Sequence, residues 1–310
     1  MANWFTTDRF TPLAPQSLLR AASAAMVALS LWAGPTLAKD PFRTTNPRPI
    51  GDQTENAFRA VFEQGNYTKA IGHIQQAEPN EPLAYAMKAS MAYIAWDGEK
   101  DDQKKAGFLE QYRSYASQTR DAARALLPSD PLRGNLYLAV GHFLEGGYIV
   151  LKEGTVKGTP KVLGEVQRAF KYLDTAEASS PNDPELNLIK GYMDLFMSIN
   201  LPFSSPSQAI ERLEKHAGPR YLADRGIALG YRDLKQPDRA LVAIDRAIKS
   251  TPDNPELYYL KAQILVQQGK HKDSVPLFER ALTKREQLPA GLVTQIEREM
   301  SRAKRRAGIS

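Results

Sequence analysis

A spacing of 34 residues recurs in the C-terminal third of the chain and limits the folds that it can adopt. Residues 221–251 and 255–285 carry the same kinds of residue at corresponding positions. The matched pairs, each 34 residues apart, are Tyr231 with Leu265, Ala240 with Ser274, Ile244 with Phe278, and Ala247 with Ala281. A repeat of this length is one supersecondary unit that buries its apolar face only against neighbouring units. The chain is therefore expected to be a stack of similar units.

Each unit is predicted to be a helix hairpin. In residues 221–251, Asp224, Ile227, Ala228 and Tyr231 fall on one helix face at spacings of three and four, and Ala240, Ile244 and Ala247 do the same in a second helix. The strings SPNDPEL (180–186) and TPDNPEL (251–257) separate units. Proline with Asp or Asn ends one helix and starts the next.

This pattern resembles the tetratricopeptide repeat family, whose units pair a small residue and an aromatic in the first helix with a small, large, small series in the second and a closing proline. Outside the matched pairs, the residues that carry the resemblance are Gly65, Asn66, Tyr67, Ala70, Ile74, Ala77 and Pro82; Ala86, Ala89, Ser90 and Tyr93; Tyr137, Gly141, Leu144, Ala169, Leu173, Ala176 and Pro181; and Gly191, Ala209 and Leu213. The fourth unit departs from the family at His216, where a small residue is preferred. The resemblance implies an all-α fold, a right-handed α-α superhelix of about six helix hairpins.

The solenoid is expected to cover residues 53–285, with its most regular units at 221–254 and 255–285. Residues 286–310 are expected to be a capping helix and a basic tail. Within them, an apolar stripe runs along one helix face through Leu288, Leu292, Ile296, Met300 and Ala303. Such a helix keeps the last apolar face of a solenoid from meeting water.

The first 38 residues have the features of an export signal. Arg9 and Arg20 precede an apolar run over residues 21–34, and Thr36-Leu37-Ala38 supplies small residues for cleavage. The run is shorter than the roughly 20 residues that a membrane-spanning helix needs. We expect cleavage after Ala38, with a retained anchor as the alternative, and a proline-rich linker over residues 39–52. An exported repeat array is also similar to exported repeat proteins of cyanobacteria and other bacteria, and the expected location is the periplasm, the thylakoid lumen or the extracellular space.

The third unit carries extra residues between its two helices. Residues 146–161 contain several glycines and Pro160, which are expected to break the helix. One interpretation is a loop that projects and contacts a partner, and the other is a longer hairpin connection.

Residue types that carry chemistry do not form a recognisable site. The chain has no cysteine, which excludes disulfides and thiolate metal sites. Its four histidines lie in different units, without the spacing of a metal-binding helix. The glycines near residue 150 do not form a phosphate-binding loop. We therefore expect a protein that is not an enzyme and that has no catalytic residues, no metal and no cofactor.

The family resemblance implies that the first helix of each unit lines a concave groove that holds an extended segment or a helix of another protein. Carried over unit by unit, the groove positions are Glu55, Arg59 and Phe62; Met87, Met91 and Ile94; Leu138, His142 and Glu145; Leu188, Tyr192 and Phe196; Arg225, Leu229 and Arg232; and Tyr259 and Gln263. From these we select Arg59, Phe62, Met87, Met91, His142, Tyr192, Phe196, Arg225, Arg232 and Tyr259 as the candidate partner-binding residues.

The hypothesis for this groove is that its apolar middle takes apolar side chains while Arg225 and Arg232 pair with acidic groups of the partner. The alternative is that Met87, Met91 and Ile94 belong to the core and that the arginines form a solvated face. The identity of the partner and the oligomeric state stay open.

Charge patterning gives a second candidate contact. Residues 284–310 carry seven basic and three acidic residues, which leaves the rest of the chain close to neutral within a total of +6. That distribution argues against a nucleic-acid-binding surface. The alternative function is a membrane-associated structural component whose basic tail touches an anionic membrane. The competing interpretation is a frayed helix end whose positive charges favour the helix C-terminus.

Overall fold

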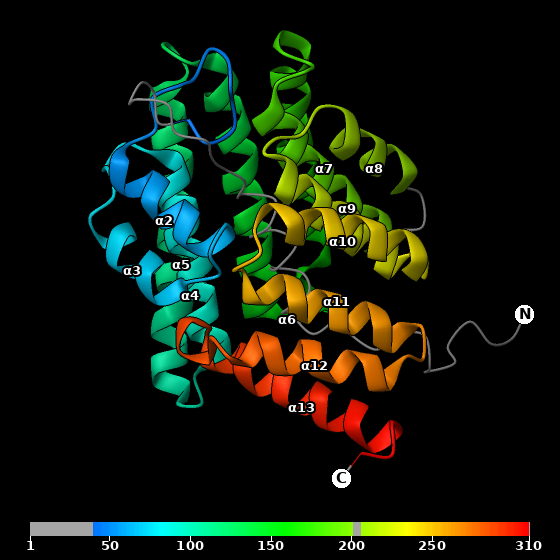
Figure 1. Cartoon of the computed structure of the whole chain (residues 1–310). Helices are drawn as coiled ribbons and strands as arrows, with labels where there is room; N and C mark the ends of the chain where they lie inside the picture. The colour runs from blue at the N-terminus through cyan, green and yellow to red at the C-terminus, as the bar shows by residue number, and fades with distance from the viewer. Residues whose placement is uncertain (1–39, 201–205, 310) are drawn as a thin grey trace, which may run out of the picture.

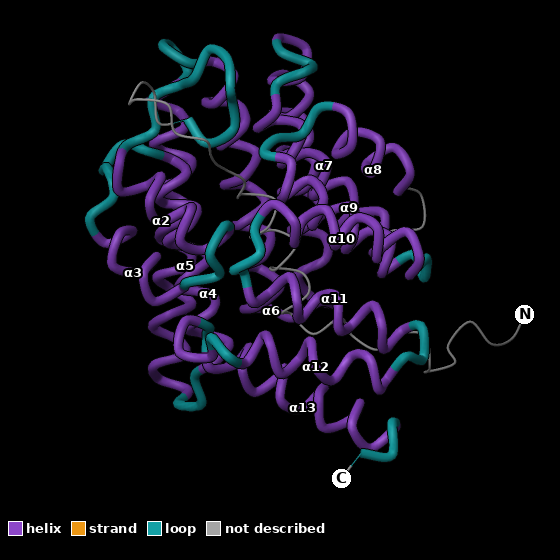
Figure 2. The backbone as a smooth tube through the Cα atoms, viewed as in Figure 1, coloured by secondary structure: helices purple, strands orange, loops and turns teal. Residues whose placement is uncertain are grey.

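The computed structural model describes residues 40–309 apart from 201–205, and the expected export signal lies outside the described residues. The described part contains twelve α-helices and no strand (Figures 1 and 2). The helices are α2 (Asp52–Phe62), α3 (Tyr67–Gln75), α4 (Pro82–Gly98), α5 (Asp102–Leu126), α6 (Pro131–Ser179), α7 (Pro184–Asn200), α8 (Pro206–Lys215), α9 (Arg220–Asp233), α10 (Pro237–Ser250), α11 (Pro255–Gln267), α12 (His271–Leu282) and α13 (Ala290–Arg306), with a 3-10 turn η1 (Arg285–Gln287).

These helices pair into six hairpins, which confirms the all-α solenoid. The pairs are α2 with α3, α4 with α5, the two halves of α6, α7 with α8, α9 with α10, and α11 with α12. Successive first helices also pack against one another, as α2 does with α4, α7 with α9, and α9 with α11. They therefore form one continuous layer. The last helix, α13, packs on α12 and buries Leu292, Val293 and Ile296.

Four of the first helices start with the same device. Glu81, Asp130, Asp183 and Asn254 each precede a proline, and each side chain accepts a hydrogen bond of 3.0 Å from a backbone N–H in the first turn of α4, α6, α7 or α11. Proline suits the first helical position because its missing N–H would have no partner there. The preceding acid or amide supplies the N-cap. This pair of residues fixes where each of these helices begins.

The expected break over residues 146–161 is much shorter in the structure. α6 is helical on both sides of Gly154, the one residue inside it with a non-helical backbone (φ 78°). Pro160 lies inside the second half, is exposed and does not end the helix. Gly158 sits close to the first half, because a Cβ there would lie 3.0 Å from Ile149. The third unit is thus a pair of long helices with a turn at one glycine.

The two ends of the array touch. The turn between α2 and α3 packs on the start of α11, where the Asn254 Nδ2 donates to the Phe62 carbonyl over 2.9 Å. The Tyr67 hydroxyl donates to Glu256 over 2.8 Å, and the Thr68 hydroxyl reaches the carbonyl of Glu286. Figure 1 shows α2 and α3 on the same side of the molecule as the start of α11 and the turn before α13. The first hairpin therefore closes the array against its last hairpin.

The segment before α2 is also packed into the fold. We call residues 40–50 the strap. Phe42 and Ile50 are buried in the same core cluster as the first helices, and Arg43 is 8% exposed. The residues expected to form a linker therefore make core contacts in the structure.

Closure depends on a close approach at Gly65. Its backbone has φ +63°, and a Cβ added there would lie 2.6 Å from the Pro255 Cδ and 2.7 Å from the Asn254 Oδ1. Gly269 has a similar φ of +76° with nothing within 4 Å. Both glycines ease a left-handed backbone, but only Gly65 also makes room for the other end of the array.

We predict that Gly65→Ala and Gly269→Ala each lose about 1 kcal/mol of unfolding free energy for the left-handed backbone. Gly65→Ala is expected to lose about 1–3 kcal/mol more because the new methyl group overlaps Pro255. Urea unfolding of the two variants measures the difference. Equal losses would show that the ends of the array are not pressed together.

Candidate protein-binding surface

Side chains from three alternate helices form a polar row, which we call the inner ladder: Arg232 on α9, Tyr259 and Gln263 on α11, and Glu299 on α13. Arg232 donates to the Gln263 Oε1 over 2.8 Å. The Gln263 Nε2 in turn donates to the Tyr259 hydroxyl over 2.8 Å and to Glu299 over 2.9 Å. The Tyr259 hydroxyl donates to Glu299 over 2.8 Å. The structure thus brings the predicted groove residues Arg232 and Tyr259 together.

Arg225 and Tyr192 lie in a second group deeper in the fold. Arg225 donates to the Glu256 carboxylate over 2.7 Å, and its side chain is 13% exposed. Burial alone would lower the pKa of the Arg225 guanidinium, but Glu256 outweighs it and the pKa is raised. The Tyr192 hydroxyl donates to the Leu222 carbonyl over 2.8 Å. Arg225 is therefore a charged group already paired inside the array.

The other predicted groove residues are spread over separate contacts. Phe62 and Met87 are buried in the core, at 5% and 1% exposure. Arg59 pairs with Glu55 and Glu63 along α2. Met91 is partly buried against the same core.

His142 and Phe196 also contact neighbouring helices. His142 lies 2.7 Å from Glu165 and stacks on Tyr172, both from the other half of α6. The Phe196 ring meets Phe143 edge-on with 5.4 Å between ring centroids. Of the ten predicted residues, Arg232 combines partial exposure with a place in the inner ladder.

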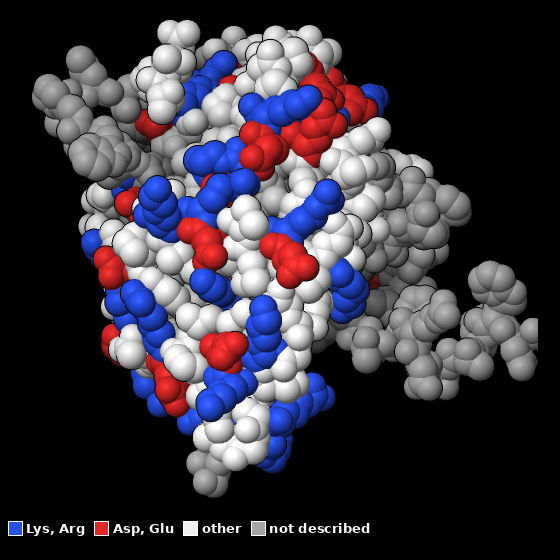
Figure 3. Space-filling view, turned by 45° about the vertical axis from the view of Figure 1, so that its right-hand side comes forward, with Lys and Arg blue, Asp and Glu red and all other residues white. Residues whose placement is uncertain are grey.

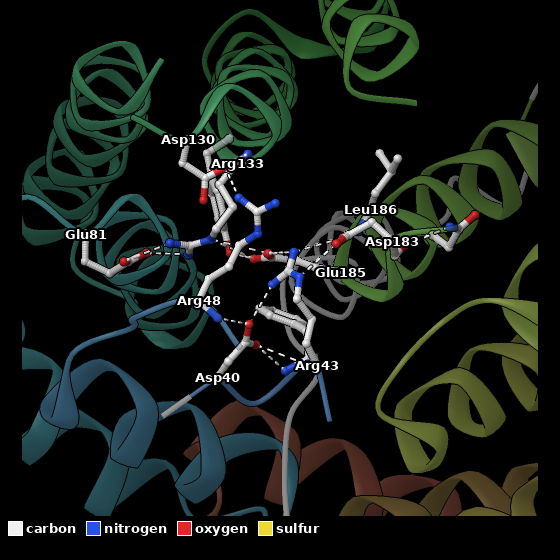
Figure 4. A network of polar contacts seen from close by, with 12 residues as sticks. Asp40, Arg43, Arg48, Glu81, Asp130, Arg133, Asp183, Glu185 and Leu186 are labelled. Atoms are coloured by element: carbon white, nitrogen blue, oxygen red, sulfur yellow. Dashed lines mark hydrogen bonds and ion pairs between the residues drawn. The ribbon is translucent and has the colours of Figure 1, made fainter. Parts of the chain in front are cut away.

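A larger polar site, which sequence analysis missed, lies where α4, α6 and α7 begin (Figure 4). We call it the cap cluster. Its members are Asp40, Arg43 and Arg48 from the strap, with Glu81, Asp130, Arg133, Tyr137, Asp183 and Glu185 from the helices. Three of its acids, Glu81, Asp130 and Asp183, are the N-caps described above. The residues that start the helices thus also bind the strap and one another.

Arg133 and Glu185 form the buried centre of the cap cluster. Arg133 is 2% exposed, and its guanidinium reaches Glu81 at 2.7 Å and Glu185 at 3.3 Å. Glu185 is fully buried and also accepts hydrogen bonds from Tyr137 at 2.7 Å and from Arg43 at 2.9 Å. Each charge therefore has several partners, which buried charges require.

Electrostatics in the cap cluster favour the charged form of Glu185. Burial would raise the pKa of Glu185, but the charges of Arg133 and Arg43 and the hydrogen bond from Tyr137 outweigh it and lower the pKa. At Asp40, burial prevails over Arg43, and the pKa is raised. The cluster is thus held together mainly by an ionised Glu185 between two arginines.

We predict that Glu185→Gln lowers the unfolding free energy by about 3 kcal/mol at pH 7, because it breaks the buried ion pairs that Glu185 makes with Arg133 and Arg43. Since the pKa of Glu185 is lowered by folding, its contribution is complete above the ordinary pKa of 4.5 and is lost as the pH falls through the lower folded value. The difference between the two proteins should therefore stay constant from pH 8 to 5 and shrink in more acidic solution.

Urea unfolding across this pH range measures the difference. Glu211→Gln is the control, since Glu211 pairs with Lys215 on the surface and should matter little. If the difference in unfolding free energy between wild type and Glu185→Gln persists or widens at acidic pH, Glu185 is not the ionised centre of the cap cluster.

A comparison with protein families identifies the repeated part of the chain. Residues 225–289 match the family model of the tetratricopeptide repeat. The chain contains tetratricopeptide repeats. The matched residues run from α9 to the turn before α13 and include the inner ladder residues Arg232, Tyr259 and Gln263. Among curated proteins, no significant match to the chain is found.

Tetratricopeptide repeats generally mediate protein–protein interactions and typically act as non-catalytic scaffolds. Over residues 40–309 without 201–205, His, Asp and Glu side chains form no group arranged to hold a metal ion. None of the helices in the described part of the chain combines the length and the apolarity that a membrane crossing requires.

Proposed function

We propose that this protein is a non-catalytic scaffold or assembly factor that acts outside the cytoplasm and holds a partner polypeptide on its layer of first helices. The repeat family supports protein binding. The leader sequence at residues 1–38 supports export, to the periplasm, the thylakoid lumen or the extracellular space. The arrangement of the inner ladder carries the proposal.

The inner ladder suits the recognition of a polypeptide. It presents a guanidinium, a carboxamide and a carboxylate from α9, α11 and α13, each partly exposed. Such groups can donate to and accept from the backbone and acidic side chains of a bound segment. Of the two arginines predicted to pair with partner acids, Arg232 has 23% of its side chain exposed and pairs with the partly exposed Asp233, while Arg225 is 13% exposed and pairs with the buried Glu256. We therefore assign the pairing with partner acids to Arg232.

A protein partner fits the charges better than a nucleic acid does. Lys and Arg side chains are interspersed with Asp and Glu over the face drawn in Figure 3. Several basic residues near the C-terminus are paired with acids, as Lys304 is with Glu279 and Arg285 with Glu297. A nucleic-acid site instead requires basic residues gathered on one face.

Site-specific photo-crosslinking in the native cell tests the proposal. A photoreactive residue at Gln263 should give a discrete protein adduct, and Arg232→Glu should abolish that adduct. The control is the same residue at Val242, which lies on α10 and is 61% exposed. The chain recovered in the adduct should begin at Lys39 if the leader is removed outside the cytoplasm. Equal adducts from both positions, no adduct from Gln263, or an intact leader on a cytoplasmic chain would contradict the proposal.

A further inference from the structure

The strap is bound to the helices as an extended peptide would be. Among the described residues, no backbone–backbone hydrogen bond joins residues 40–50 to a helix. The backbone N–H groups of Phe42, Arg43 and Arg48 instead donate to the Asp40 carboxylate, inside the strap itself. The strap is therefore held through its side chains, and its departure would break no secondary structure.

Phe42 supplies the apolar part of this contact. Its ring meets Phe58 of α2 edge-on, with 5.9 Å between ring centroids, and is 4% exposed. Its carbonyl lies against Gly218, where an added Cβ would come within 3.0 Å of the carbonyl oxygen and 3.1 Å of Pro184. The array is thus shaped to accept one aromatic residue and its backbone between α2 and the start of α9.

Arg43 supplies the polar part. Its Nε and Nη2 donate to the two oxygens of Asp183 over 2.8 and 2.9 Å, a bidentate contact. The Nη2 also donates to Glu185 over 2.9 Å. This geometry is the one by which a guanidinium recognises carboxylates most specifically. Five positions further along, Arg48 forms an ion pair with Asp130.

Charge explains why the site needs such an occupant. The helices contribute Glu81, Asp130, Asp183 and Glu185 against one arginine, Arg133, a formal charge of 1 − 4 = −3. The strap adds two arginines and Asp40, which brings the sum to −2. Removing the strap would take the Arg43 guanidinium away from Asp183 and leave Glu185 with Arg133 alone of its two arginines, which is costly for buried carboxylates. Any segment that replaces the strap must therefore bring at least one positive charge, and the bidentate contact at Asp183 favours a guanidinium.

We propose that the strap is an intramolecular ligand, and that its binding site accepts an extended segment of a partner protein in which an aromatic residue is followed by an arginine. The proposal rests on the function proposed above, because an exchange of strap for partner presupposes a protein-binding scaffold. Binding of the partner segment releases residues 40–50. The released strap then becomes accessible.

A peptide of residues 40–51 tests this inference on the full-length chain. Fluorescence anisotropy should show that a chain carrying Phe42→Ala and Arg43→Ala binds the labelled peptide at least tenfold more tightly than wild type, because its own strap no longer competes. A peptide with Arg43→Ala should bind at least tenfold more weakly than the unchanged peptide. Arg124→Ala, which removes an exposed arginine paired with Asp121, is the matched control and should behave as wild type.

Equal binding of the peptide by wild type and the double variant, or equal binding of the two peptides, would overturn the proposal. A wild-type dimer held by exchanged straps would overturn the intramolecular assignment. Because the double variant can lose its fold, hydrogen exchange on wild type gives an independent measurement. The amides of Phe42, Arg43 and Arg48 should exchange at least tenfold faster than those of the buried stretch of α6 around Leu136. Exchange at the same rate would show that the strap is part of the cooperative core and is not displaceable.

The two proposals fail separately. If the Gln263 adduct is absent but the peptide binds as expected, only the proposal that the inner ladder binds a partner is rejected. If the Gln263 adduct forms but the peptide does not bind, only the proposal that a partner segment replaces the strap is rejected.

Discussion

The structure depends on residues that start helices and bind the N-terminal part of the chain at the same time. Asp183 caps α7 and pairs with Arg43, while Glu81 caps α4 and pairs with Arg133. Asn254 caps α11 and holds the Phe62 carbonyl. A cap satisfies only one or two of the free N–H groups of a helix, so its other oxygen or its amide nitrogen remains available. The caps of α4, α6 and α7 lie near one another and form a polar edge with the strap (Figure 4).

The polar edge and the contact between the two ends of the array limit the surface on which this solenoid can bind a partner. In an array held only by contacts between neighbouring units, the ends are free and the inner layer is open. Here Gly65 and Asn254 bring the ends together, and the strap fills the space beside α2, α6 and α7. On the inner face, Arg232 and Gln263 of the inner ladder stay partly exposed. The predicted groove position Met87 stabilises the fold, because it is buried in the core.

The regular part of the fold could be predicted from the sequence because its signals are local. The pair of units around Ala240 and Ser274 and the proline punctuation specify hairpins through spacing alone. The turn at Gly154 was not predictable in the same way. Several glycines and Pro160 compete as helix breakers there, and only the close packing of the two halves of α6 decides among them.

The cap cluster could not be predicted, because it joins residues far apart in the chain. Arg43 lies in a proline-rich stretch whose composition is typical of a linker, and its partners are 140 residues away. The acids of the cluster could have been noticed in the sequence, since an acid before proline recurs at Glu81, Asp130 and Asp183. It contained no sign that these acids share one edge, nor that Arg225 would be paired within the fold.

The central claim, that the caps bind the strap, is tested most directly by a double-mutant cycle on Arg43 and Asp183. Urea unfolding gives the unfolding free energies of wild type, Arg43→Ala, Asp183→Ala and the double variant. Asp183→Ala also removes the N-cap of α7. This capping contribution is lost whether or not Arg43 is present, so it cancels in the cycle. We predict a coupling free energy of about 2 kcal/mol or more for this buried bidentate pair. Additive losses, with no coupling between the two residues, would contradict it.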